Sequence, residues 1–261
     1  MEFIVLICIF FIVLFFVVSK KSYKVKNTLL KKEEIIEKYE NQLKKILANY
    51  QDKNEQIKQK KIFFITATNT DVGKTFASEL FLKKFAKKGK KVGYFKPIET
   101  GVIDLPLDGS KILNITKQLN PDFTFTIDEI VPYQYKLPAA PFVAKENTKI
   151  TLKKIFSQAL KLLQKCDVLI IEGAGGLMVP IKKNYFMIDL IKDFQNKFDS
   201  QTILIGSSML GSINDTLLSQ KALKNYSINY KWYINLHKDK KQFKKITLPF
   251  YKEYFDKISY L

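Results

Sequence analysis

The sequence contains no arginine, so lysine alone supplies its 44 basic residues and a formal net charge of +19. An arginine finger, which stabilises the transition state in many NTPases, is therefore excluded for this chain. Proteins that read nucleic-acid bases rely on the planar guanidinium fork. The chain is also rich in Lys, Ile, Phe and Asn, which indicates compositional drift, so we expect no nucleic-acid partner.

Histidine and cysteine are almost as scarce. The single histidine, His237, leaves little material for a histidine-based triad or a zinc site. Cys8 lies in an apolar run and Cys166 at the entrance of a predicted strand, and neither has a partner at metal-ligand spacing. We expect both to be reduced thiols that pack as small hydrophobic residues.

Residues 3–18 are almost wholly apolar, FIVLICIFFIVLFFVV. This run is slightly shorter than the roughly 20 residues that a spanning helix needs. Glu2 and the lack of a small-residue cleavage motif disfavour a signal peptide. Lysines follow the run at once, which places the rest of the chain in the cytoplasm. We predict that residues 1–20 are a transmembrane anchor that tethers the chain to the inner membrane. The alternative is that the start of the protein is wrongly assigned.

Residues 21–60 form a charged segment without glycine or proline after the anchor, and they predict a long helix. Apolar side chains recur at every seventh residue, but only half of the matching d positions are apolar. The apolar positions are Leu29, Ile36, Leu43, Tyr50 and Ile57. Two interpretations remain: a weak coiled coil that supports dimerisation, or a spacer helix between the membrane and the domain.

The stretch around which the remaining chain is organised is residues 61–75, KIFFITATNTDVGKT. An apolar strand run, a polar turn and a helical pattern follow one another, the context of a phosphate-binding loop. The N-terminus of the helix would bind an anion, and Gly73 permits close approach of the backbone to it. Lys74 would reach the terminal phosphates of a nucleotide, and Thr75 would offer its hydroxyl to Mg²⁺. The generic motif needs glycine at position 68, where Thr68 stands.

Residues 61–261 predict one α/β domain of the P-loop NTPase type, a parallel sheet flanked by helices. Ligands of such sheets lie at the carboxyl ends of the strands, so Lys96 and Thr100 should lie near Lys74. Glu172, after a buried strand, matches the acidic residue that holds Mg²⁺ in NTPases. The strands are expected at 62–65, 92–95, 167–171, 202–206 and 230–236, with Gly89 ending the first helix, a loop at 131–142 and a turn at 248–250.

Several motifs in order resemble the dethiobiotin synthetase family. They are ITATNTDVGKT, YFKPIETG, the turn at Asp108, LPAAPFVA, IIEGAGGLMVPI, LGSIND and the strand that ends at Asn235. The resemblance covers roughly residues 61–250, and the family's loop also has five residues before Gly-Lys-Thr. It implies ATP-dependent closure of the ureido ring of dethiobiotin from 7,8-diaminononanoate and CO₂, in biotin biosynthesis.

The resemblance also implies the intermediates and the site. One amine forms a carbamate, ATP phosphorylates it, and the second amine displaces phosphate. Lys96 and Lys74 would be catalytic, and Thr75, Asp108 and Glu172 would bind Mg²⁺, with Asp104 as a competitor of Asp108. A homodimer is implied, with a substrate seat supplied by the partner subunit near residues 210–214. The implied ATP-binding residues are Asp71, Val72, Gly73, Lys74, Thr75, Phe76, Asp108, Glu172, Gly173, Ala174, Gly175, Asn235, Leu236, Pro249, Phe250 and Tyr251, and the substrate-binding residues are Thr70, Thr100, Leu210, Gly211 and Ser212.

Two other hypotheses compete with a synthetase. A membrane-tethered ATPase switch of the partitioning type shares this fold, but its second lysine would stand at position 69, which is Asn69. A membrane-anchored scaffold with a decayed ATP site is disfavoured because Lys74, Lys96 and Glu172 are all present.

Overall fold

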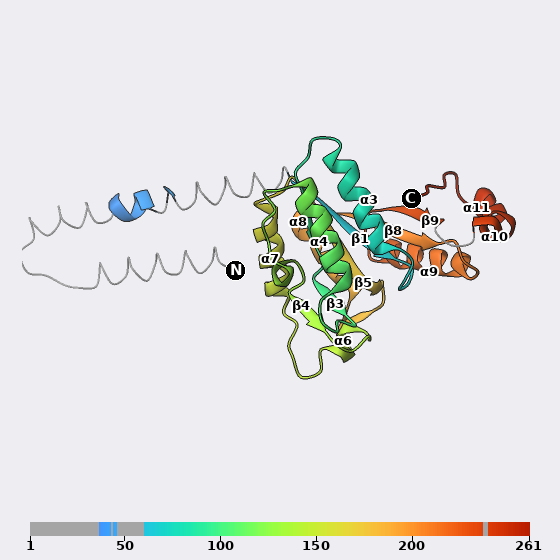
Figure 1. Cartoon of the computed structure of the whole chain (residues 1–261), viewed down its shortest axis with the longest axis horizontal. Helices are drawn as coiled ribbons and strands as arrows, with labels where there is room; N and C mark the ends of the chain where they lie inside the picture. Colours follow the sequence, from blue (N-terminus) through green and yellow to red (C-terminus); the bar gives the residue numbers. More distant parts are fainter. Residues whose placement is uncertain (1–36, 43, 46–59, 237–239) are drawn as a thin grey trace, which may run out of the picture. The chain divides into compact units, whose positions relative to one another are not determined.

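The computed structural model describes residues 37–42, 44–45, 60–236 and 240–261 (Figure 1). The chain divides into two units, Met1–Glu55 and Gln56–Leu261. In the first unit, 37–42 and 44–45 are helical, as predicted for the spacer. The predicted anchor at 3–18, most of the spacer with its heptad positions, and His237 lie outside the described residues. Within the described part, no helix is both long enough and apolar enough to span a bilayer.

The second unit is built on a parallel five-stranded sheet, as predicted. Its strand order is β2-β5-β1-β8-β9, and each neighbouring pair is parallel. Two small sheets accompany it, one that pairs β3 with β4 and one that pairs β6 with β7. The strands are β1 (Lys61–Ala67), β2 (Val92–Phe95), β3 (Ile98–Thr100), β4 (Tyr133–Tyr135), β5 (Val168–Gly176), β6 (Pro180–Lys182), β7 (Tyr185–Phe186), β8 (Gln201–Ser207) and β9 (Tyr230–Asn235).

Helices flank the sheet. In the view of Figure 1, α3 and α4 lie in front of the strands, and the two helices contact each other. The aromatic rings of Phe156 in α7 and Phe194 in α8 pack edge to face at 5.0 Å. The helices are α3 (Lys74–Ala86), α4 (Leu107–Leu119), α5 (Ile127–Ile130), α6 (Pro141–Ala144), α7 (Leu152–Leu163), α8 (Met187–Phe198), α9 (Ser212–Asn225), α10 (Lys240–Gln242), the π-helix η1 (Phe243–Thr247) and α11 (Leu248–Tyr254).

The core lies between the sheet and its helices. The strands β2 and β5 are buried along their apolar runs, as expected for strands covered on both faces. Phe64, Tyr94 and Phe95 are among the largest fully buried side chains. Cys166 is a free thiol buried in the core, as predicted for a cysteine that packs as a small hydrophobic residue, and burial raises its pKa to about 12.

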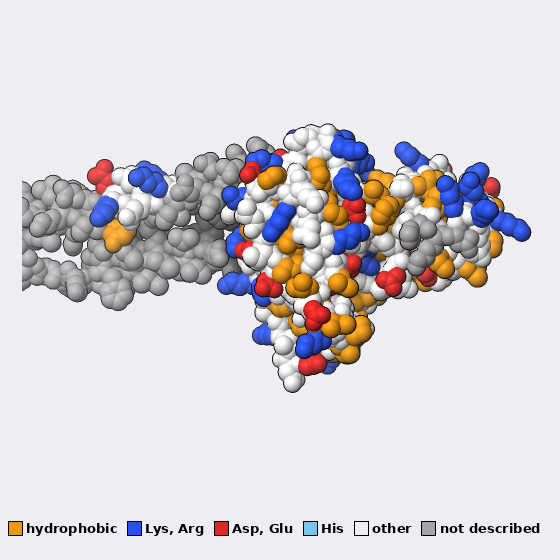
Figure 2. All heavy atoms as spheres, in the orientation of Figure 1, with side chains coloured by type: hydrophobic (Ala, Val, Ile, Leu, Met, Phe, Trp, Pro, Cys, Tyr) orange, Lys and Arg blue, Asp and Glu red, His pale blue; other side chains and the backbone are white. Residues whose placement is uncertain are grey.

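Several local predictions hold and others are wrong. Helix α3 ends at Ala86 with Lys87 as its C-cap, two residues before the predicted Gly89; Gly89, at φ 71°, lies in the turn that follows, with its N–H bonded to the Ala86 carbonyl. The predicted loop at 131–142 instead contains β4 and the start of α6, and the predicted turn at 248–250 begins the helix α11, where Pro249 fits the first turn because it needs no N–H partner there. Strand β5 continues past Ile171 to Gly176. On the face shown in Figure 2, lysines mix with acidic and hydrophobic side chains.

Candidate active site

The loop after β1 wraps around the start of α3. Asp71 and Gly73 take the left-handed conformation, with φ 56° and 107°. A Cβ at Gly73 would lie 2.2 Å from the Asn235 amide nitrogen, so only glycine fits this turn. That amide donates to the Val72 carbonyl at 2.9 Å and ties the end of β9 to the loop. The free N–H groups of the first turn of α3 make this loop suitable for an anion.

Lys74, the first residue of α3, is buried at the base of this loop. Its Nζ donates to the Asn69 carbonyl at 3.2 Å. Burial lowers the pKa of Lys74 from 10.5 to about 8, although the nearby Glu172 carboxylate favours the charged form. A bound phosphate would restore the charge that burial disfavours, so the side chain is prepared for an anionic ligand.

Lys96 follows β2 and lies between two carboxylates, as the sheet topology predicts. Its Nζ is 2.7 Å from Glu172 Oε1 and 2.8 Å from Asp108 Oδ2. Burial alone lowers the pKa of Lys96, but the charges of Glu172 and Asp108 outweigh it and the pKa is raised. Asp104, the competing candidate, is exposed in the loop before α4. The structure therefore brings Asp108 to the lysine.

Glu172, at the end of the apolar part of β5, is the centre of the site. Its side chain is fully buried. Thr75 Oγ1 donates to Oε1 at 3.0 Å, while Ser78 and Tyr94 donate to Oε2 at 2.7 and 3.0 Å. The roles of Ser78 and Tyr94 were not predicted from the sequence. A tyrosine in a buried strand needs a partner for its hydroxyl, and this was the available signal for Tyr94.

Glu99 was also missed. It lies in β3, three residues after Lys96, and only 6% of it is exposed. Its two carboxylate oxygens accept the backbone N–H groups of Asp108 and Gly109, each at 3.0 Å. Helix α4 begins at Leu107 after Pro106, which has no side chain that can cap it. The uncapped helix start was the signal that a distant acceptor is needed.

A cavity of about 270 Å³ lies beside the phosphate loop. It gathers predicted ATP and substrate residues from three chain segments at the carboxyl edge of the sheet. Leu210 is 77% exposed at its rim. The buried Ser212 hydroxyl, in the first turn of α9, has no hydrogen-bond partner among the described residues. The cavity is lined by Asn69, Thr70, Asp71, Val72, Ser207, Ser208, Met209, Leu210, Asp215 and Asn235.

The remaining predicted residues lie around this edge with different exposure. Phe76 is exposed on α3, Thr100 ends β3, and 173–175 continue β5 beyond Glu172. Tyr251 differs from the expectation for a nucleotide contact: its ring is fully buried, and its hydroxyl lies 2.9 Å from both the Ser212 carbonyl and Thr216 Oγ1. Its side chain supports the start of α9. Of the neighbours of Tyr251 and Asn235, Pro249 and Phe250 are exposed and Leu236 is half-buried.

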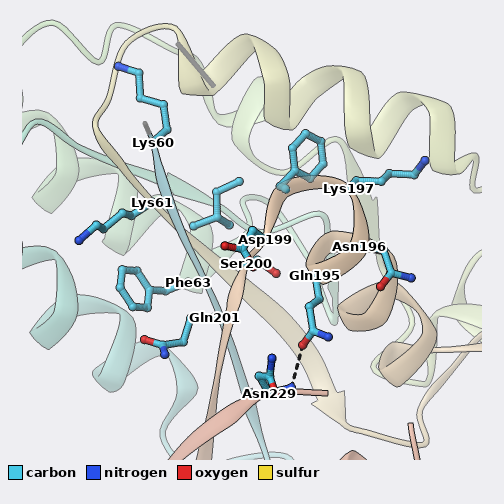
Figure 3. Close-up of a pocket in the computed structure, with 12 residues that line it drawn as sticks. Lys60, Lys61, Phe63, Gln195, Asn196, Lys197, Asp199, Ser200, Gln201 and Asn229 are labelled. Atoms are coloured by element: carbon cyan, nitrogen blue, oxygen red, sulfur yellow. Dashed lines mark hydrogen bonds between the residues drawn. The ribbon is translucent and has the colours of Figure 1, made fainter. Parts of the chain in front are cut away.

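A second cavity, of about 880 Å³, lies at the opposite edge of the sheet (Figure 3). The starts of β1 and β8 and the end of α8 form it. Gln195 points toward Asn229 there and accepts its backbone N–H at 2.8 Å. None of the predicted site residues lines this cavity.

The donor set at Lys96 suits a hard cation. Thr75, Asp108 and Glu172 offer oxygen atoms only, and Mg²⁺ at nucleotide sites binds one or two carboxylates together with phosphates and waters. Among the described residues, no group of three or more His, Cys, Asp or Glu side chains could hold a metal by itself. These residues therefore fit Mg²⁺ that arrives with a nucleotide.

A glycine loop at a helix start, a buried lysine and an acidic strand end, all at one edge of a parallel sheet, define a P-loop nucleotide-binding protein. A family model described as an AAA domain matches residues 61–243. The ATP-dependent dethiobiotin synthetase BioD of Sulfurovum sp. is 46% identical over 74% of this chain and 90% of its own length. The protein of the same name from Wolinella succinogenes is 37% identical, over 74% and 89%.

The chain therefore belongs to the family of ATP-dependent dethiobiotin synthetases. The MinC:MinD cell division complex of Aquifex aeolicus is 20% identical, with a TM-score of 0.45 over 77% of this chain and 79% of that chain.

Proposed function

We propose that Lys96, held between Asp108 and Glu172, is the catalytic lysine of ring closure. The chain is an ATP-dependent ligase of biotin biosynthesis, as its family membership gives. The observation that carries the proposal is the buried ammonium 2.8 and 2.7 Å from the two carboxylates, next to the phosphate loop. Phosphoryl transfer depends on positioning and on neutralising charge, and this ammonium supplies both.

Three bond changes follow in order. One amine of 7,8-diaminononanoate bonds to the carbon of CO₂ and loses a proton, which gives a carbamate. A carbamate oxygen bonds to the γ-phosphorus of ATP, and ADP leaves. The second amine then bonds to the carbonyl carbon and loses a proton, the C–O bond to phosphate breaks, and phosphate departs with closure of the ring. Lys96 neutralises the carbamate and Lys74 holds the γ-phosphate throughout.

Thr75, Asp108 and Glu172 would hold Mg²⁺, which would offset phosphate charge when bound. For the nucleotide we propose Asp71–Phe76, Asp108, Glu172–Gly175, Asn235, Leu236, Pro249 and Phe250. Asn235 would recognise the adenine. For the substrate we propose Thr70, Thr100 and Leu210–Ser212. Support comes from one cavity at the carboxyl edge of the sheet, which is lined by Thr70, Asp71, Val72, Leu210 and Asn235.

The test is turnover by the full chain. Diaminononanoate, bicarbonate, Mg²⁺ and ATP are supplied, and dethiobiotin is detected by mass. Lys96→Ala should abolish product, whereas Lys161→Ala, which removes the lysine of the ion pair with Glu129, should leave turnover unchanged. Product formation by Lys96→Ala at the wild-type rate would overturn the assigned role.

We also propose a homodimer in which the partner's α9 start seats the substrate carboxylate. Leu210 is strongly exposed next to that helix start, which supports this proposal. Sedimentation equilibrium gives the subunit number. Leu210→Glu would repel the carboxylate, and Leu210→Gln is the uncharged control. Mixing Lys96→Ala with Leu210→Glu subunits should restore turnover, because a mixed dimer keeps one intact site; no restoration would contradict shared sites.

The membrane tether at residues 3–18 stays a proposal, supported by the length of the apolar run and the lysines after it. The full chain should sediment with the membrane fraction and resist a high-salt wash. Deletion of residues 3–18 should release it. Recovery of the intact full chain in the supernatant would contradict the tether.

A further inference from the structure

We infer that Glu99 is a positioning residue that sets the distance between Asp108 and Lys96 by fastening the start of α4 to β3. The inference rests on the proposed roles of Lys96 and Asp108. The carboxylate of Glu99 accepts the backbone N–H groups of Asp108 and Gly109, so its direct contact is with the backbone that carries Asp108. Its charge also favours the charged form of Lys96 and helps to raise the pKa of that lysine.

The start of α4 depends on this distant carboxylate. The first N–H groups of a helix lack partners within the helix, and a side chain at the N-cap normally accepts them. Pro106 occupies that place and offers none. Glu99 takes both the Asp108 and the Gly109 N–H, one with each oxygen, and its negative charge suits the positive end of the helix.

Close packing makes this contact specific. A Cβ at Gly109 would lie 2.5 Å from Val131 Cγ2 and 3.1 Å from Glu99 Oε2. The missing side chain at Gly109 therefore lets the carboxylate reach both amides. A substituent there would push α4 away from β3.

The segment that carries Lys96 is also fixed by a backbone hydrogen bond. Lys96 and Glu99 share the short segment from β2 into β3, and the Lys96 backbone N–H donates to the Ile130 carbonyl at 2.9 Å. Asp108 is held to this segment by two hydrogen bonds: its carboxylate accepts from the Lys96 ammonium, and its backbone N–H donates to Glu99. Loss of the bond to Glu99 would let Asp108 move while the chain stays folded.

The experiment compares Glu99→Gln with the wild-type full chain. A glutamine oxygen can accept one N–H, but its NH₂ group then opposes the other. We expect kcat to fall by about tenfold or more, because small misplacements at a reacting centre are costly, with KM for ATP changed less. Asp167→Asn is the matched control: Asp167 accepts the Lys91 N–H at the opposite sheet edge, and its loss should leave kcat unchanged.

A double-mutant cycle tests whether Glu99 acts through Asp108. With Asp108→Asn already present, Glu99→Gln should lower kcat by no more than about twofold further, since both changes disturb one unit. Effects that multiply independently would overturn the inference. Amide hydrogen exchange gives a readout apart from turnover: the Asp108 and Gly109 amides should exchange faster in Glu99→Gln, and unchanged exchange would also overturn it.

A second variant separates positioning from helix stability and serves if Glu99→Gln folds poorly. Pro106→Ser would supply a side-chain oxygen that can accept one of the two amides that Glu99 holds, but it would not connect that amide to β3. In Glu99→Gln/Pro106→Ser, we expect the Tm to recover while kcat stays low. Recovery of both would show that Glu99 only caps α4. Full activity of Asp108→Asn would instead refute the proposed site, a result distinct from failure at Glu99 alone.

Discussion

Raising the pH from 7 to 9 should weaken ATP binding about tenfold through Lys74. Burial lowers the pKa of this lysine to about 8, so its charged fraction falls from roughly nine tenths at pH 7 to one tenth at pH 9. A phosphate binds the ammonium form. The lowered pKa also sets the sign of the effect on stability. Because the unfolded chain binds this proton more tightly, burial of protonated Lys74 destabilises the folded chain by about 3 kcal/mol. This cost applies in full below pH 8 and vanishes as the pH rises to 10.5.

Isothermal titration of ATP and Mg²⁺ into the full chain measures this effect. Titrations at pH 9 in two buffers of different ionisation enthalpy should give uptake of close to one proton per ATP. Lys96 stays charged throughout because its carboxylate partners raise its pKa. The last ionisation of a phosphate monoester has a pKa near 6, below the window used.

Lys74→Arg is the matched control. A guanidinium stays charged over this range, so the affinity of this variant should be lower but independent of pH. An equal dissociation constant at pH 7 and 9 in the wild type, with no proton uptake, would refute the argument that burial holds Lys74 poised near neutrality.

Three further predictions follow from the contacts at the site. Glu172→Gln should lower the free energy of unfolding by about 3–5 kcal/mol, because it breaks a buried ion pair with Lys96. Glu129→Gln breaks an exposed ion pair and should cost less than about 1 kcal/mol. Urea titration compares the two variants, and equal losses of stability would contradict the argument from burial. Tyr94→Phe should cost about 1.5–3 kcal/mol in the same titration, because it removes a hydrogen bond to a charged group, and a neutral result would show that this bond contributes nothing. Gly73→Ala should abolish ATP binding, because its Cβ would meet the Asn235 side chain. Gly89→Ala is the control: Gly89 also has a left-handed backbone, but open space surrounds it, so this variant should bind ATP normally. Calorimetry measures both affinities, and normal affinity of Gly73→Ala would contradict the close approach.

The sequence predicted those parts of the site that follow from local pattern and sheet topology. A strand, a glycine turn and a helix start place Lys74, and the ends of parallel strands bring Lys96 and Glu172 to the same edge. Asp108, which the structure places 2.8 Å from Lys96, was named first but not separated from Asp104, because both lie in a segment without periodicity.

The missed residues act over long distances along the chain. Tyr94 and Glu172 are separated by 78 positions, and no local pattern distinguishes a tyrosine that serves a carboxylate from one that only packs. Glu99 could have been found by asking which group satisfies the uncapped start of α4. The short strand β4 and the helix α11 were missed because proline-containing segments were interpreted as loops, although proline is compatible with a helix's first turn.

The two ends of the catalytic domain differ in their distance from the site. Lys61 enters β1 at the edge remote from the phosphate loop, and seven strand residues span about 20 Å between them. At the other end, the Leu261 N–H donates to the Ile234 carbonyl, next to Asn235. A label, fusion or immobilising handle should therefore be placed ahead of Lys60, because one added after Leu261 would emerge beside the proposed nucleotide site at Asn235.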